Sequence, residues 1–118
     1  MELAAKLQIK PGAQVAVVAA PSDGPDLSAL GPRAADPAAA DAVIAFVTRA
    51  AELADTAAPA VAAAREDRLA WIAYPKAGQL GTNINRDTLA AAVSELGVRP
   101  VRQVALDPVW SALRFRPA

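Results

Sequence analysis

Three short apolar runs rich in β-branched and aromatic residues set the framework of the chain. They span residues 14–19, 41–47 and 68–74, and each is nearly continuous. A strand with one face in water alternates between apolar and polar side chains, whereas a strand that is covered on both faces does not. The pattern therefore predicts three buried strands that run parallel in one sheet.

The first two connections between these runs differ in character. Residues 21–41 hold four prolines and two glycines, so we expect a long Pro/Ala-rich surface loop there. Residues 49–67 contain strong helix formers, and Thr48 is a suitable N-cap. Because proline disrupts a helix interior, we expect a break near Pro59 and a second helical piece that starts there.

A helix and a hairpin follow the third run. Residues 86–96 predict an amphipathic helix with Asn85 as its N-cap. Residues 100–107 and 110–116 are typical of strands. The link between these two strands is so short that it permits only an antiparallel hairpin.

The order of elements predicts a single α/β domain over residues 1–118, because parallel strands joined by crossover helices build an open doubly wound sheet. The closing antiparallel hairpin resembles the end of the methyltransferase version of this Rossmann-like fold. That resemblance implies a truncated, three-layer fold with five strands in the order 1-2-3-5-4 and an antiparallel last strand. A resemblance of fold carries no function with it.

The predicted topology locates a candidate site, because ligands of open α/β sheets bind beyond the carboxyl ends of the parallel strands. Lys76 and Arg86 lie near the predicted helix start at Asn85, where two cationic side chains and free backbone N–H groups could bind an anion. Alternatively, Lys76 is only solvated and Arg86 pairs with Asp87. Trp110 either stacks on a ligand or packs half-buried in the sheet. The candidate ligand-binding residues are Tyr74, Lys76, Asn85, Arg86, Asp107 and Trp110.

The first strand lacks the turn that a dinucleotide or S-adenosylmethionine site needs. Such sites place a glycine-rich turn directly after this strand, so that the backbone can approach the ligand. Here the strand is followed by Pro21, which has no N–H group, and only Gly24 is available. We therefore expect no cofactor.

The amino-acid composition excludes several kinds of site and partner. The chain has neither cysteine nor histidine, which excludes disulfides, the common zinc sites and a histidine base, and we expect no metal site. Twelve basic and twelve acidic side chains cancel, which does not favour nucleic acid or an anionic membrane as a partner. The sequence shows no signal peptide and no apolar run near the ~20 residues of a membrane span, so we expect a cytoplasmic protein.

The uneven charge of the two halves either supports contact between copies or is only scattered, solvated charge. Residues 1–60 carry four basic and seven acidic groups, whereas residues 61–118 carry eight basic and five acidic groups. Alanine buries little apolar area, so an alanine-rich core would gain stability from a homodimer interface. A homodimer is therefore one expected assembly.

The second half of the chain carries three short motifs. These are Tyr-Pro-Lys at 74–76, Asn-Arg-Asp at 85–87 and, after Asp107, Trp-Ser-Ala-Leu-Arg-Phe at 110–115. Over residues 69–117 the combination resembles an uncharacterised bacterial family of small α/β domains of unknown function. The resemblance implies a bacterial source and no particular activity, substrate or cofactor.

Two functions of different classes follow from these observations. The first is a non-catalytic α/β module that binds a partner, either a small anion or a protein, or associates with itself. The second is a small enzyme or sensor in which Lys76 and Arg86 hold an anionic metabolite and Asp107 or Tyr74 handles a proton. The missing glycine-rich turn, histidine and cysteine favour the first hypothesis.

Overall fold

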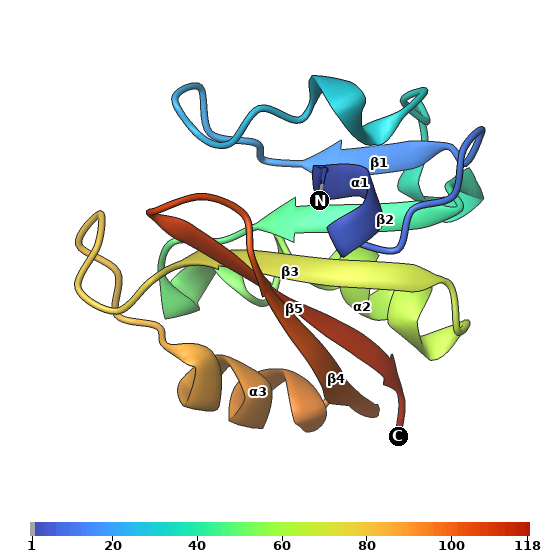
Figure 1. Cartoon of the computed structure of the whole chain (residues 1–118). Helices are drawn as coiled ribbons and strands as arrows, with labels where there is room; N and C mark the ends of the chain where they lie inside the picture. Colours follow the sequence, from blue (N-terminus) through green and yellow to red (C-terminus); the bar gives the residue numbers. More distant parts are fainter. Residues whose placement is uncertain (1) are drawn as a thin grey trace.

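The computed structural model describes residues 2–118, which form a five-stranded mixed sheet flanked by short helices (Figure 1). The elements are α1 (Leu3–Lys6), β1 (Val15–Val18), η1 (Ser28–Leu30), η2 (Pro37–Ala39), β2 (Ala42–Phe46), η3 (Ala50–Glu52), α2 (Ala58–Arg65), β3 (Leu69–Pro75), α3 (Arg86–Ser94), β4 (Val98–Ala105) and β5 (Trp110–Pro117), where η marks a 3-10 helix. The strand order is β1-β2-β3-β5-β4, and β5 is antiparallel to both neighbours. The α/β class, this order and the antiparallel last strand are therefore confirmed.

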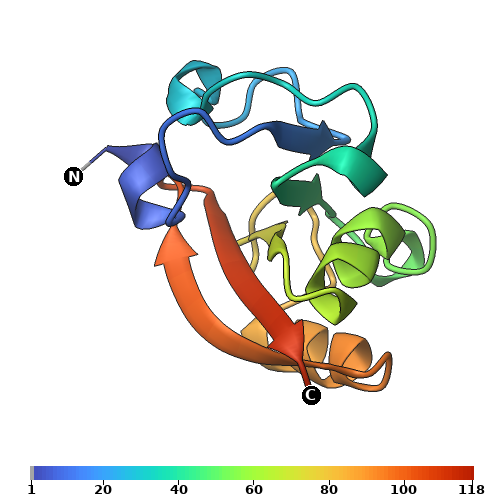
Figure 2. The ribbon, with the colours of Figure 1, turned by 90° about the vertical axis from the view of Figure 1, so that its right-hand side faces the viewer.

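An apolar layer covers each face of the sheet. On one face, Val43, Ile72 and Leu113 belong to a buried cluster that includes residues of α2 and α3. On the other face, Ile44 and Trp71 belong to a second cluster, to which α1 and η1 contribute. Figure 2 shows α1 on one side of the sheet and α2 and α3 on the other. The side chains of successive strand residues supply the two layers in turn.

The connection after β2 differs from the helix predicted to begin at residue 49. Only the 3-10 turn η3 forms there, and α2 follows with Pro59 in its first turn. The predicted break is confirmed, whereas the helix predicted before it is wrong. Bonds to a distant loop account for the difference: the Arg49 guanidinium donates to the Gly81 carbonyl and the Ala50 N–H donates to Asn83 Oδ1, both at 2.8 Å.

Residues 21–41 contain the two short turns η1 and η2 and are tied to the outer edge of β1. The Val15 N–H donates to the Pro32 carbonyl, and the Ala34 N–H donates to the Val15 carbonyl, each at 2.9 Å. Leu30 is buried under the sheet. The segment thereby satisfies backbone groups of an edge strand that would otherwise be open.

The N-terminal segment lies across the sheet face opposite α2 and α3, and no pattern in the sequence predicts this. Leu7 and Ile9 are buried in the cluster that contains Trp71. The Trp71 Nε1–H group donates to the Leu7 carbonyl at 3.0 Å, across 64 positions of the chain. Because Leu7 is fully buried, its carbonyl depends on this donor for a partner.

Replacing Trp71 by Phe should destabilise the protein more than replacing Trp110 by Phe. Both rings are buried, but only the Trp71 ring hydrogen-bonds the backbone of another segment. We expect Trp71→Phe to cost about 1–3 kcal/mol more in the free energy of unfolding, because it leaves a buried carbonyl without its donor. Urea denaturation of both variants measures the difference, and equal losses would contradict this role of Trp71.

Candidate functional site

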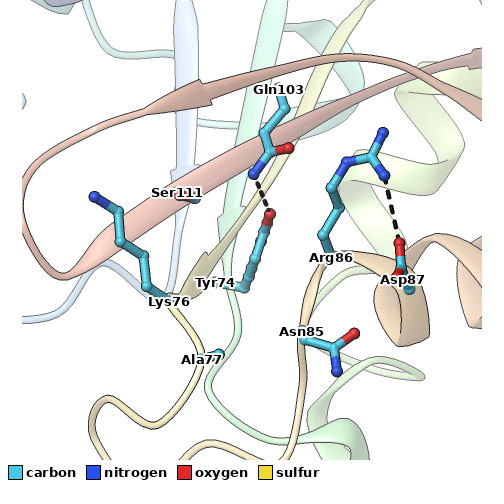
Figure 3. Close-up of a pocket in the computed structure, with 8 residues that line it drawn as sticks. All are labelled: Tyr74, Lys76, Ala77, Asn85, Arg86, Asp87, Gln103 and Ser111. Carbon is cyan, nitrogen blue, oxygen red and sulfur yellow. Dashed lines mark hydrogen bonds and ion pairs between the residues drawn. The ribbon is translucent and has the colours of Figure 1, made fainter.

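An open cleft lies at the carboxyl end of β3, between the start of α3 and the β4–β5 hairpin (Figure 3). Its volume is about 540 Å³. The position is the edge at which open α/β sheets bind ligands. The residues that line the cleft are Tyr74, Lys76, Ala77, Asn85, Arg86, Asp87, Gln103 and Ser111.

The pairing of β3 with β5 places two buried hydroxyl groups together. Tyr74 and Ser111 are directly opposite each other in this antiparallel pair, so their side chains share one face of the sheet. Tyr74 is 2% exposed and Ser111 is 5% exposed. Ser111 is the one buried polar side chain among the described residues besides the tyrosine, and its hydroxyl forms no hydrogen bond within residues 2–118.

A β-bulge in β4 brings Gln103 to the same place. The register between β4 and β5 shifts between Pro100 and Arg102, so Val101 is an extra residue on this strand. Beyond the bulge, Gln103 is opposite Leu113 and therefore on the Tyr74 face. The Gln103 Nε2–H group donates to Tyr74 Oη at 3.0 Å (Figure 3). We call Tyr74, Ser111 and Gln103 the floor of the cleft.

Two cationic side chains stand beside the floor. In Figure 3, the hydrogen-bonded pair of Tyr74 and Gln103 lies between Lys76 and Arg86. The Lys76 N–H donates to the Val109 carbonyl at 2.7 Å, which fixes its backbone against the hairpin. Within residues 2–118 the Lys76 ammonium group forms no ion pair. Its charge is therefore available to the cleft.

The start of α3 forms the opposite wall of the cleft. Asn85 is the N-cap, as predicted: its Oδ1 accepts from the Thr88 N–H at 2.9 Å, and Thr88 Oγ1 accepts from the Asn85 N–H at 3.0 Å. The Arg86 guanidinium and the Asp87 carboxylate are 3.4 Å apart, with side chains that are 57% and 89% exposed. The N–H groups of Arg86 and Asp87 lie in the first turn, where a helix offers no backbone acceptor.

Burial keeps the Tyr74 phenol protonated. Removal from water raises the pKa of Tyr74 above its ordinary value, the positive charge of Arg86 opposes this increase, and the negative charge of Asp87 adds to it. At neutral pH the phenol is therefore a hydrogen-bond donor and is not a base. The Gln103 amide occupies one lone pair of the phenol oxygen and leaves the phenol proton free to bond elsewhere.

The structure brings four of the six candidate residues to this cleft, namely Tyr74, Lys76, Asn85 and Arg86. Asp107 and Trp110 do not line it. The Asp107 carboxylate accepts from the Val109 N–H at 2.8 Å and the Trp110 N–H at 2.6 Å, and so holds the hairpin turn. The Trp110 ring points to the other face, where it meets Phe46 edge-on with ring centroids 5.2 Å apart.

Gln103 and Ser111 line the cleft but were not among the residues predicted from the sequence. Side-chain alternation relative to Tyr74 would have identified Ser111 if the register of β5 on β3 had been known. Gln103 had no such signal, because the bulge at Val101 changes the face on which every later residue of β4 lies.

A metal-binding cluster and a membrane-spanning helix are both absent from the described residues 2–118. These residues contain no group of three or more Asp, Glu, His or Cys side chains placed to hold a metal ion. None of their helices combines the length and the apolar character that crossing a bilayer requires.

Comparison of the chain with protein families, with curated proteins and with solved structures finds no match. The geometry of the cleft therefore carries the functional argument.

Proposed function

We propose that this chain is a non-catalytic α/β binding module that holds a small anionic ligand in the cleft at the carboxyl end of β3. The observation that carries the proposal is the placement of Lys76 and Arg86 around a floor of neutral hydrogen-bonding groups. Cations and uncharged donors together recognise a phosphate, sulfate or carboxylate group, because such a group accepts hydrogen bonds from both.

The charge balance of the cleft supports an anion. Lys76 and Arg86 contribute two positive charges, and Asp87 contributes one negative charge. The Arg86–Asp87 pair is exposed and long at 3.4 Å, so it contributes little stability and leaves the guanidinium free to turn toward a ligand. The unpaired amides in the first turn of α3 add a partial positive charge at the same wall.

The state of the floor favours binding over catalysis. Tyr74 stays neutral, so it does not serve as a base near neutral pH. The Ser111 hydroxyl has no hydrogen-bonded base among residues 2–118 that would activate it. Asp107, the other proton-handling candidate, is committed to the hairpin turn. These groups are suited to holding a ligand and orienting it.

Self-association receives less support from the surface. β4 is an edge strand, but Arg99 and Arg102 are exposed on it and the bulge at Val101 interrupts its pairing edge. Charges and bulges on an edge strand discourage the addition of a further strand. The large exposed apolar side chains are Leu80, Leu96 and Val101, which come from three separate segments of the chain.

Removing either cation should weaken anion binding. We expect Lys76→Gln and Arg86→Gln each to raise the Kd for inorganic phosphate by about tenfold or more, because a hydrogen bond to a charged group is worth roughly 1.5–3 kcal/mol. Amide chemical shifts followed by NMR during a phosphate titration at low ionic strength measure both the Kd and the location of binding.

Lys10→Gln is the matched control, because Lys10 is an exposed lysine outside the cleft. It should leave the Kd for phosphate unchanged. Equal weakening by Lys10→Gln and Lys76→Gln would show a general charge effect, and the proposed site would be wrong.

Titration of the phenol tests the neutral state of Tyr74 directly, because Tyr74 is the only tyrosine of the chain. Tyrosinate absorbance should rise with a midpoint above that of the urea-unfolded chain, whose tyrosine ionises near pH 10. The unfolded phenol then loses its proton first, so the free energy of unfolding should fall as the pH rises above about 10.

Two variants separate the causes of this pKa shift. Arg86→Gln should raise the midpoint of Tyr74 further, because it removes the charge that stabilises tyrosinate. Asp87→Asn should lower the midpoint, because it removes a repelling charge. A native midpoint at or below the unfolded one would refute the assignment of Tyr74 as a neutral donor.

A further inference from the structure

The floor of the cleft has hydrogen-bonding capacity that an anion alone does not use. The Tyr74 hydroxyl accepts from Gln103 and has no acceptor for its own proton within residues 2–118. The Ser111 hydroxyl has no partner in that range, although the residue is only 5% exposed. Both residues line the cleft, so the free hydrogen-bonding positions of their hydroxyl groups face it and are open to water or to a ligand.

The three residues of the floor differ in the hydrogen bonds that they can still form with a ligand. Tyr74 offers a donor, the Gln103 carbonyl oxygen offers an acceptor, and Ser111 offers both. A sulfate or carboxylate group only accepts hydrogen bonds and therefore makes none with the Gln103 oxygen, which belongs to an exposed residue and is otherwise open to water. A hydroxyl group donates one hydrogen bond and accepts others, so neighbouring hydroxyl groups match all three.

The size of the cleft agrees with a ligand larger than a single anion. Its volume of about 540 Å³ falls in the range of ligand pockets for whole metabolites. The lining, however, offers no surface for a nucleobase. Ala77 is its one apolar side chain, and Tyr74 is its one aromatic residue, with a ring that is packed in the core. Bases are held by stacking on exposed aromatic rings.

We propose that the ligand is a phosphorylated sugar or polyol, with its phosphate on Lys76 and Arg86 and its hydroxyl groups on Tyr74, Ser111 and Gln103. This inference rests on the proposed function, because it takes the anion site as given and adds the neutral half of the ligand. The cations stand at the two sides of the cleft, and the groups that match hydroxyls lie on its floor between them.

Calorimetric titration with four probes tests the inference: inorganic phosphate, ribose 5-phosphate, ribose and adenosine 5′-monophosphate. Ribose 5-phosphate should bind about tenfold or more tightly than inorganic phosphate, since each neutral hydrogen bond contributes roughly 0.5–1.5 kcal/mol. Adenosine 5′-monophosphate should bind no more tightly than ribose 5-phosphate, because the base finds no stacking surface. Ribose alone should bind weakly, because it lacks the charged group.

The variant Ser111→Ala isolates the contribution of the floor. It should weaken ribose 5-phosphate binding by about three- to tenfold, since one neutral hydrogen bond is lost, and should weaken inorganic phosphate binding by a smaller factor, because the two cations supply most of that binding. Ser94→Ala, at an exposed serine of α3, is the matched control and should change neither Kd. Thermal unfolding of both variants verifies that they remain folded.

The outcomes separate the inference from the function on which it rests. If inorganic phosphate binds but ribose 5-phosphate binds no more tightly, the sugar phosphate assignment is wrong and the anion site stands. If Ser111→Ala weakens both ligands equally, the floor does not recognise hydroxyl groups and the assignment is also wrong. If adenosine 5′-monophosphate binds most tightly, the ligand is a nucleotide. If neither phosphate nor ribose 5-phosphate binds, both proposals fail.

Discussion

The insertion of β5 between β3 and β4 is the constraint on which the cleft depends. Because β5 runs antiparallel to β3, the hairpin turn returns to the edge where the parallel strands end. This pairing places Ser111 opposite Tyr74 and locks the backbone of Lys76 to Val109. The Asp107 carboxylate secures the turn by accepting two backbone N–H groups.

The bulge in β4 is a second, local constraint on the cleft. In a regular strand counted from the buried residue Val98, Gln103 would lie on the face opposite Tyr74. The extra residue Val101 restores Gln103 to the Tyr74 face, and it sends the next residue, Val104, to the other core. One strand therefore contributes a polar side chain to the cleft and an apolar side chain to the opposite layer. Bulges often occur beside functional sites because they redirect side chains in this way.

Much of the fold was predictable because the signals that specify it are local. Continuous β-branched runs, the short hairpin link and the cap at Asn85 each act within a few residues and sufficed for the strands, the hairpin and the start of α3, whereas the strand order came from the resemblance to the methyltransferase version of the fold. The failures have tertiary causes. The turn η3 replaces a helix because Arg49 and Ala50 bond to a distant loop. Trp110 was assigned to the correct edge of the sheet, but its side chain alternates with Ser111 to the opposite face, and only the register of β5 decides which of the two enters the cleft.

The N-terminal segment shows how strongly this fold separates its earliest residues from their packing partners. Leu7 and Ile9 follow α1 near the start of the sequence, yet the cluster that buries them is built largely from β1, β2, β3 and β5. During synthesis on the ribosome these side chains emerge long before Trp71, the residue that anchors them. The four-residue helix α1 is too short to persist alone in water. The segment therefore has little structure of its own, and its apolar side chains stay exposed until the strands that bury them have assembled.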